Sequence, residues 1–242
     1  SDVRVFRLVN DDWEPLGNNI TNPSGEDIGF ALAISGDGTI LATSSPHANS
    51  EVGEVQVFEW VGDAWSQKGS TLQGQGEEIN FGYAVSLSQD GSRLAVGIPD
   101  DYDGETNGFV RVFEFIDNDW VQIGQTLQGA NVGGWFGEDV SLSSDGQTLA
   151  VGAANSDENS DSLGSVHIYR FGSDGQWFEP GSMLIGNVED EYFGDNVALS
   201  GDASILVASG SGLMRFFEAH GDYWIEFGEE ATDSLFDNTA AI

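Results

Sequence analysis

The sequence lacks cysteine altogether and has only 7 lysine or arginine residues against 41 aspartate or glutamate residues. The absence of cysteine excludes disulfide bonds, thiolate metal sites and a cysteine nucleophile. The formal net charge of −34 repels nucleic acid and anionic lipid, so neither is expected as a partner. Cations, basic partners or a salty medium suit this charge, because salt screens the self-repulsion.

Long hydrophobic runs are also missing. No stretch approaches the ~20 consecutive apolar residues that span a bilayer, so we expect no membrane insertion. The 39% of apolar residues, with 15 phenylalanines and 33 glycines, are nevertheless enough for a folded core and unlike a disordered tail. No window shows a helical period with caps, which favours an all-β fold.

One phrase recurs along the chain. Its clearest copies read FGYAVSLSQDGSRLAVGIPD from Phe81 and FGEDVSLSSDGQTLAVGAAN from Phe136, and weaker copies begin at Ile28 and Phe193. A second phrase ends on a tryptophan about every 50 residues, a period typical of propeller blades rather than of helical solenoids. The recurring tryptophans are Trp13, Trp65, Trp120, Trp177 and Trp224.

Each unit divides into four short strands. In the unit that begins at Phe81, these are an opening strand at 82–88, a buried second strand at 93–98, an alternating third strand at 109–115 and a fourth strand from 120 to about 127. The alternation in the third strand predicts one solvent-exposed face, on which His167 would stand at the position of Arg111. Radial blades leave only short protected edges, so four antiparallel strands per unit favour a propeller, with the phenylalanines and tryptophans packed between blades.

The units indicate the number of blades. Complete units start near residues 28, 81, 136 and 193, and partial units occupy 1–20 and 235–242. We therefore expect a single β-propeller domain over 1–242, with about five blades of four antiparallel strands and the last blade shared between the termini. The second strand of that shared blade is missing, so the alternative is that the chain is part of a longer repeat protein.

The FG opening, the LAVG strand and the GxVxVF strand together resemble FG-GAP repeats, over essentially the whole chain. These repeats form the propeller of integrin α-subunits and many acidic secreted proteins of algae and marine bacteria. The resemblance implies a propeller at the cell surface or outside the cell, with a role in adhesion or protein binding.

The sequence departs from the integrin pattern in the loop between the first two strands. Integrin-type blades often hold calcium there, but here each loop offers one carboxylate, whereas calcium takes six to eight oxygens. We therefore expect these aspartates to stabilise Asp-Gly turns instead of binding metal. They are Asp37, Asp90, Asp145 and Asp202.

Two acidic loops between second and third strands, at 99–108 and 155–164, are better candidates for calcium. Their oxygen donors at alternate positions suit Ca²⁺, although neither loop matches the EF-hand pattern. A solvated acidic loop is the alternative. The candidate metal ligands are Asp100, Asp101, Asp103, Glu105, Asp157, Glu158 and Asp161.

The residues that follow the opening glycine differ between units. If the opening strands are innermost, these side chains project toward the central channel. Carboxylates across a channel suit a glycosidase acid/base pair or a bound cation, although no aromatic sugar platform is evident beside them. The candidate ligand-binding residues are Tyr83, Glu138, Asp139, Asp195 and Asn196.

These observations favour a non-enzymatic interaction module that binds a protein or glycan through its loops, with calcium as a possible bridge. One alternative is a carbohydrate-active enzyme that uses the acidic residues of the channel. The other is a structural segment of a larger repeat assembly.

Overall fold

The computed structural model describes residues 1–22, 27–75, 79–99, 107–155, 163–188 and 190–232. All regular elements in these ranges are β-strands. The described ranges accordingly contain no helix that could span a membrane. The predicted all-β class is confirmed.

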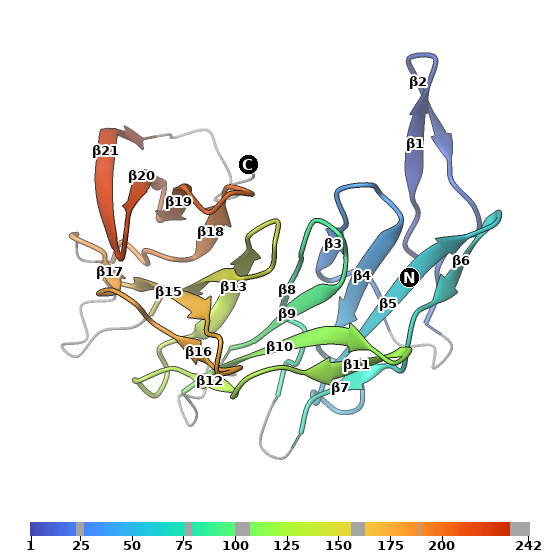
Figure 1. The fold of residues 1–242 in the computed structure, drawn as a ribbon, viewed down its shortest axis with the longest axis horizontal. Coiled ribbons are helices and arrows are strands. Elements are labelled where there is room, and N and C mark those ends of the chain that lie inside the picture. Colours follow the sequence, from blue (N-terminus) through green and yellow to red (C-terminus); the bar gives the residue numbers. More distant parts are fainter. Residues whose placement is uncertain (23–26, 76–78, 100–106, 156–162, 189, 233–242) are drawn as a thin grey trace.

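Four sheets of the same topology follow one another along the chain, each with consecutive strands paired antiparallel (Figure 1). The first sheet contains β3 (Leu32–Ile34), β4 (Ile40–Ser45), β5 (Glu54–Val61) and β6 (Ala64–Gln67). The second contains β8 (Ala84–Leu87), β9 (Arg93–Ile98), β10 (Phe109–Ile116) and β11 (Asp119–Gln122). The third contains β13 (Phe136–Leu142), β14 (Thr148–Ala153), β15 (Ser165–Phe171) and β16 (Trp177–Phe178). The fourth contains β18 (Asn196–Leu199), β19 (Ile205–Gly210), β20 (Leu213–His220) and β21 (Tyr223–Thr232).

The fourth strand of a unit is split in the first three sheets. The segment expected as one strand from residue 120 to about 127 forms β11 and then β12 (Leu127–Gln128), and both pair with β10. Gly124 lies between them with a φ of 67°, a conformation that interrupts a strand and that glycine adopts most easily. The first and third sheets have the equivalent β7 (Leu72–Gln73) and β17 (Leu184–Ile185).

A two-stranded hairpin precedes the first sheet. It consists of β1 (Phe6–Val9) and β2 (Asp12–Pro15), which correspond in sequence to the third and fourth strands of a unit. The indole N–H of Trp65 on β6 donates to the carbonyl of Leu16 just after the hairpin, at 2.9 Å. Residues 235–242, expected to close the ring, lie outside the described residues, so the count of five blades stays a prediction.

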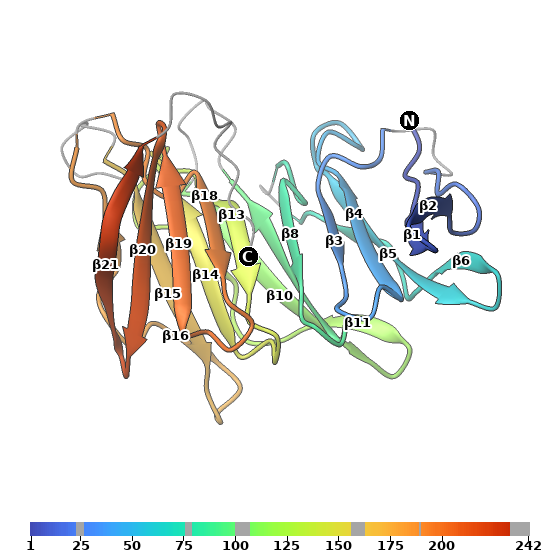
Figure 2. The ribbon, with the colours of Figure 1, turned by 90° about the horizontal axis from the view of Figure 1, so that it is seen from above.

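The opening strands of the four sheets, β3, β8, β13 and β18, lie in order beside one another as the innermost layer (Figure 2). Backbone hydrogen bonds connect the turns that follow them: Gln89 N–H donates to the Ser144 carbonyl at 3.0 Å, and Ser144 N–H donates to that of Gly201 at 2.8 Å. The sheets therefore stack as radial blades. In both views the hairpin and β21 lie at opposite ends of the arc.

The Asp-Gly turns after the opening strands have the predicted role. Ser88 Oγ donates to Asp90 Oδ1 at 2.7 Å, the same oxygen accepts the N–H of Ser92 at 2.9 Å, and Ser88 Oγ accepts the N–H of Arg93 at 3.0 Å. The carboxylate and hydroxyl thus satisfy the polar backbone groups of the turn. Equivalent hydrogen bonds form at the other three aspartates, Asp37, Asp145 and Asp202.

The core lies between the blades rather than within one of them. The phenylalanines that open three units, Phe81, Phe136 and Phe193, are almost completely buried. Each belongs to a separate apolar cluster that joins two adjacent sheets. The expectation that the opening phenylalanines and the tryptophans pack between blades is confirmed for Trp65, Trp120 and Trp177.

The expectation of a solvent-exposed face on the third strand of each unit is wrong. Arg111 on β10 is buried, with its guanidinium 5.0 Å from the ring centre of Phe113 and 5.7 Å from that of Phe81. His167 on β15 lies in the same way against Phe136, at 5.4 Å. In the second, third and fourth units the opening phenylalanine lies over this face, so the polar side chains of Arg111, His167 and Arg215 are enclosed.

Candidate functional site

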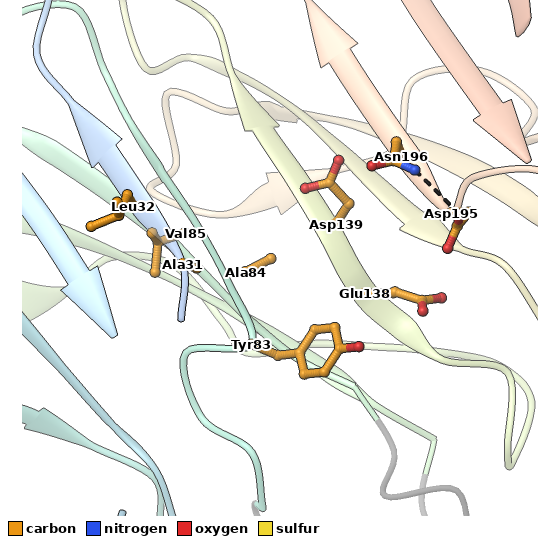
Figure 3. A pocket seen from close by; sticks show the side chains of 9 residues that line it. All are labelled: Ala31, Leu32, Tyr83, Ala84, Val85, Glu138, Asp139, Asp195 and Asn196. Atoms are coloured by element: carbon orange, nitrogen blue, oxygen red, sulfur yellow. Dashed lines mark hydrogen bonds between the residues drawn. The ribbon is translucent and has the colours of Figure 1, made fainter. Parts of the chain in front are cut away.

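A pocket of about 490 Å³ opens over the innermost strands, and all four sheets contribute to it (Figure 3). The sequence placed five candidate ligand-binding residues at this level of the fold, and the structure brings all five together in the pocket. Their role in binding stays a prediction. The lining residues are Ala31, Leu32, Tyr83, Ala84, Val85, Glu138, Asp139, Asp195 and Asn196.

The Phe-Gly pair that opens the second, third and fourth units positions these side chains. Gly137 has a φ of 92°, and a Cβ built on it would lie 2.5 Å from the carbonyl oxygen of Phe109, so the close approach of the two backbones requires glycine. The next residue, Glu138, donates its backbone N–H to the Trp135 carbonyl at 3.0 Å. In the fourth unit, the backbone N–H of Asp195 donates to the Tyr192 carbonyl at 3.1 Å in the same kind of turn. This repeated turn directs equivalent side chains from successive blades toward one space.

Asp139 connects two blades. Its Oδ1 accepts the N–H of Val140 at 2.9 Å, and its Oδ2 accepts the N–H of Val197 on β18 at 2.7 Å. Burial raises the pKa of Asp139 to about 7, although the two backbone N–H groups act in the opposite direction. This carboxyl group therefore holds the innermost strands together as well as lining the pocket.

Glu138 has a different environment. Its Oε2 is buried and makes no hydrogen bond within the described part of the chain. Burial, followed by the charges of Asp195 and Asp139, raises the pKa of Glu138 to about 8. Glu138 thus holds a proton at neutral pH, and an arriving cation would favour its ionised form.

The two sides of the pocket differ in chemistry. Ala31, Leu32, Ala84 and Val85 from β3, β8 and the residues next to β3 make one side apolar, and the carboxyl groups and Asn196 from the third and fourth sheets make the other acidic (Figure 3). Tyr83 lies between the two sides. A molecule with an alkyl portion and a positively charged head matches this arrangement, because each part meets a side of suitable polarity.

Aromatic rings at this end of the fold were missed by sequence reasoning. The rings of Trp135 and Tyr192 are stacked, with centroids 6.3 Å apart and planes 16° apart, and their carbonyls accept the N–H groups of Glu138 and Asp195. Phe30 lies 5.1 Å from the ring of Tyr83. The available signal was an aromatic residue directly before Phe-Gly in two units.

The candidate calcium loops lie outside the described residues. This applies to all seven carboxylates: Asp100, Asp101, Asp103, Glu105, Asp157, Glu158 and Asp161. Elsewhere in the described chain, no group of three or more histidine or acidic side chains is arranged to hold a metal ion. Calcium binding stays a prediction.

One further polar group has the connectivity of a catalytic triad. Ser165 Oγ lies 3.2 Å from His167 Nε2, and His167 Nδ1 lies 3.2 Å from Glu179 Oε1. Ser165 is buried at the start of β15, however, so a substrate carbonyl has no access to its hydroxyl. We assign this group to the structure of the third blade.

Comparison with known proteins supports the repeat interpretation. The FG-GAP repeat family matches residues 126–169, which include β12 to β14, most of β15 and the pocket residues Glu138 and Asp139. No curated protein sequence matches the chain.

Solved structures resemble the whole fold. A periplasmic gluconolactonase from Pseudomonas aeruginosa superposes with a TM-score of 0.65 at 16% sequence identity, and the match covers 97% of this chain and 65% of that protein. A candidate 6-phosphogluconolactonase from Bacteroides uniformis gives a TM-score of 0.65 at 16% identity, covering 96% of this chain and 65% of that one. This chain thus spans less than two thirds of the length of either protein. At such identities the likeness shows the fold alone, and with the sheet topology it confirms an all-β propeller.

Proposed function

We propose that this propeller is a non-enzymatic binding module whose inner pocket takes a basic side chain, lysine or arginine, of a partner protein. The observation that carries the proposal is the two-sided pocket of about 490 Å³, in which Glu138, Asp139 and Asp195 face an apolar side. The alkyl stem of a basic residue would contact the apolar side, and its positively charged head would pair with the carboxyl groups and favour their ionised form.

The charge of the whole chain supports a basic partner. A net charge of −34 creates a field that attracts cations over a longer range than the pocket itself. Such steering raises the association rate and weakens as salt is added. The ring of Tyr83, which lines the pocket, would add cation–π attraction.

Calorimetric titration at low salt tests the proposal, with agmatine and Nα-acetyl-lysine amide as probes. We expect the combination of Glu138→Gln and Asp195→Asn to weaken binding about tenfold or more, because it removes the carboxylate of Asp195 and the Glu138 carboxyl group that a cation would ionise. Glu218→Gln on β20 removes one charge from an exposed side chain and serves as the control. Equal weakening in the control, or no binding of either probe, would contradict the proposal.

A specific observation also favours a second candidate, acid-catalysed cleavage of a glycoside. The pKa of Glu138, raised to about 8, leaves a proton available at neutral pH, as a general acid requires. A hydrolysis screen over aryl glycosides separates the two functions. Turnover that disappears in Glu138→Gln would replace binding by catalysis as the function of the pocket.

The proposal includes an extracellular or cell-surface location and calcium bridging through the loops at 99–108 and 155–164. An FG-GAP match and acidic loops support this part. Thermal melting with and without calcium tests the bridging: a midpoint that rises with calcium and falls with a chelator supports it, and an unchanged midpoint contradicts it.

A further inference from the structure

A contact between tryptophan and glycine recurs where the blades meet. At three of the four blade junctions, the tryptophan of one unit lies against a glycine that follows, by four residues, the tryptophan of the unit before it. At the fourth junction, Gly181 lies against the backbone carbonyl of Asp222 instead of against Trp224. A Cβ built on the glycine would meet indole Cδ1 at 3.3 Å for Gly17 and Trp65, and at 2.8 Å for Gly69 and Trp120. For Gly124 and Trp177 the distance is 2.6 Å.

At each end of the arc, one of the two residue types of this contact is exposed: Trp13 at one end and Gly228 at the other. Trp13 on the hairpin is 69% exposed, whereas Trp65, Trp120 and Trp177 are 5%, 6% and 3% exposed. Gly228 on β21 follows Trp224 by four residues and has a φ of 81°, close to the 79° of Gly17, yet no described atom lies within 4 Å of where its Cβ would be. Within the described residues, the arc therefore has an exposed tryptophan at one end and, at the other, a glycine that no tryptophan covers.

The surfaces around these two positions are apolar. Beside Trp13, Phe6 and Leu8 are 46% and 56% exposed. Phe58, which occupies the position of Phe6 in the first sheet, is buried. The hairpin thus presents the kind of face that each complete blade turns toward the blade before it.

The opposite end presents the complementary face. Ile225 and Phe227 on β21 are 52% and 44% exposed, and Phe216 beside Phe227 is only partly buried. The equivalent of Phe216 in the second sheet, Val112, is 1% exposed. These side chains stand where the other blades pack against the blade that follows.

We propose that the hairpin β1–β2 of one copy of this chain docks on strands β20–β21 of a second copy, with Trp13 against Gly228. The two surfaces lie at opposite ends of the same arc (Figures 1 and 2), so a second copy can bring them together as neighbouring blades already are. The contact is heterologous, because each copy uses a different surface, and it extends head to tail. This proposal is independent of the pocket and its ligand.

The charge of the chain gives the interaction a characteristic salt dependence. Two copies, each with a net charge of −34, repel one another, and salt screens this repulsion while leaving the apolar contact. Self-association should therefore strengthen as salt is added, whereas binding of a basic ligand in the pocket weakens. The opposite trends keep a failure of one proposal distinct from a failure of the other.

Sedimentation velocity over a range of protein and salt concentrations tests the docking. We expect the mass of the wild-type chain to grow with protein concentration at high salt. Trp13→Ala and Gly228→Ala should each lower the association constant about tenfold or more, as expected for a central aromatic contact. Val132→Ala, which truncates an exposed apolar side chain away from both surfaces, is the matched control and should leave association unchanged. Circular dichroism of each variant verifies that it is folded.

Mixing the variants gives the sharpest outcome. A Trp13→Ala copy keeps its glycine surface, and a Gly228→Ala copy keeps its tryptophan, so a mixture of the two should form a one-to-one dimer that does not grow further. A wild-type chain that stays monomeric at high salt overturns the proposal. This holds also if Trp13 is protected from quenching in the monomer, because its own chain then covers it. So does association that Trp13→Ala leaves unchanged, or a mixture that behaves like its separate components.

Discussion

The carboxylate of Asp139 on β13 accepts the backbone N–H of Val197 on β18 at 2.7 Å. The neighbouring Glu138, one residue earlier on the same strand, has a buried oxygen without such a donor in the described chain. The two adjacent acidic residues of the pocket therefore have different roles. Asp139 connects blades, and Glu138 is the carboxyl group that a ligand can still engage.

Asp139→Ala should destabilise the fold by about 1–3 kcal/mol, because the substitution leaves the N–H groups of Val140 and Val197 without their acceptor. Asp139→Asn keeps an oxygen in place and should cost clearly less. Urea denaturation measures both values. Equal losses for the two substitutions would show that the side-chain oxygens do not hold the blades together.

The raised pKa of the Glu138 carboxyl group should make the free energy of unfolding depend on pH. Its pKa is raised from 4.5 to about 8 in the folded protein, so between these values the folded chain holds a proton that the unfolded chain has released. The contribution of Glu138 to the free energy of unfolding is therefore full below pH 4.5 and falls as pH rises toward 8. Glu138→Gln removes this contribution. The variant should gain stability relative to the wild type across that window, and a constant difference at all pH values would contradict the assignment.

Two glycines with similar backbone angles allow a matched test of the blade interface. Gly69 has a φ of 75° and lies under Trp120, whereas Gly228 has a φ of 81° with no described neighbour at its Cβ position. Alanine adds the same backbone strain at both positions, about 1 kcal/mol. Gly69→Ala should lower the free energy of unfolding by more than Gly228→Ala does, because only at position 69 does the added methyl group clash with a neighbour, the indole of Trp120. Thermal melts of dilute protein at low salt measure the difference.

Glu191 provides a test of the fourth blade. Its fully buried side chain accepts the N–H groups of Asn187 and Val188 at 2.6 and 3.1 Å and lies 3.7 Å from the guanidinium of Arg215. Glu191→Ala removes the oxygen that accepts both N–H groups and leaves Arg215 with its other carboxylate, Glu226. Breaking such a buried pair costs about 3–5 kcal/mol. Hydrogen exchange localised to β19 and β20 should accelerate, while exchange in the first sheet should not.

The repeats made most of the fold predictable from the sequence. The second strand expected at 93–98 coincides with β9, and the Asp-Gly turns form the hydrogen bonds that their residues predict. The split between β11 and β12 was missed because a single glycine with positive φ, Gly124, causes it. The burial of Arg111 was also missed, because period-two alternation cannot indicate that Phe81 covers the polar face.

The candidate site followed from the places where the repeats differ. Tyr83, Glu138 and Asp195 occupy equivalent positions after the opening glycine, and the topology brings them together. The stacking of Trp135 on Tyr192 was not predictable, since it depends on the spacing of two blades rather than on residues near in sequence. The exposure of Trp13 was not predictable for the same reason, because the sequence around Trp13 resembles the sequence around the buried Trp65, Trp120 and Trp177.

The proposed binding of a basic side chain is tested most directly by the protons that binding releases. At neutral pH Glu138 holds a proton because its pKa is about 8, and Asp139, with a pKa of about 7, holds one in part. A cation in the pocket should expel them. Titration of agmatine at neutral pH in buffers of different ionisation enthalpy counts these protons. We predict net proton release that is largely lost in Glu138→Gln, and a binding heat that does not depend on the buffer would contradict the account.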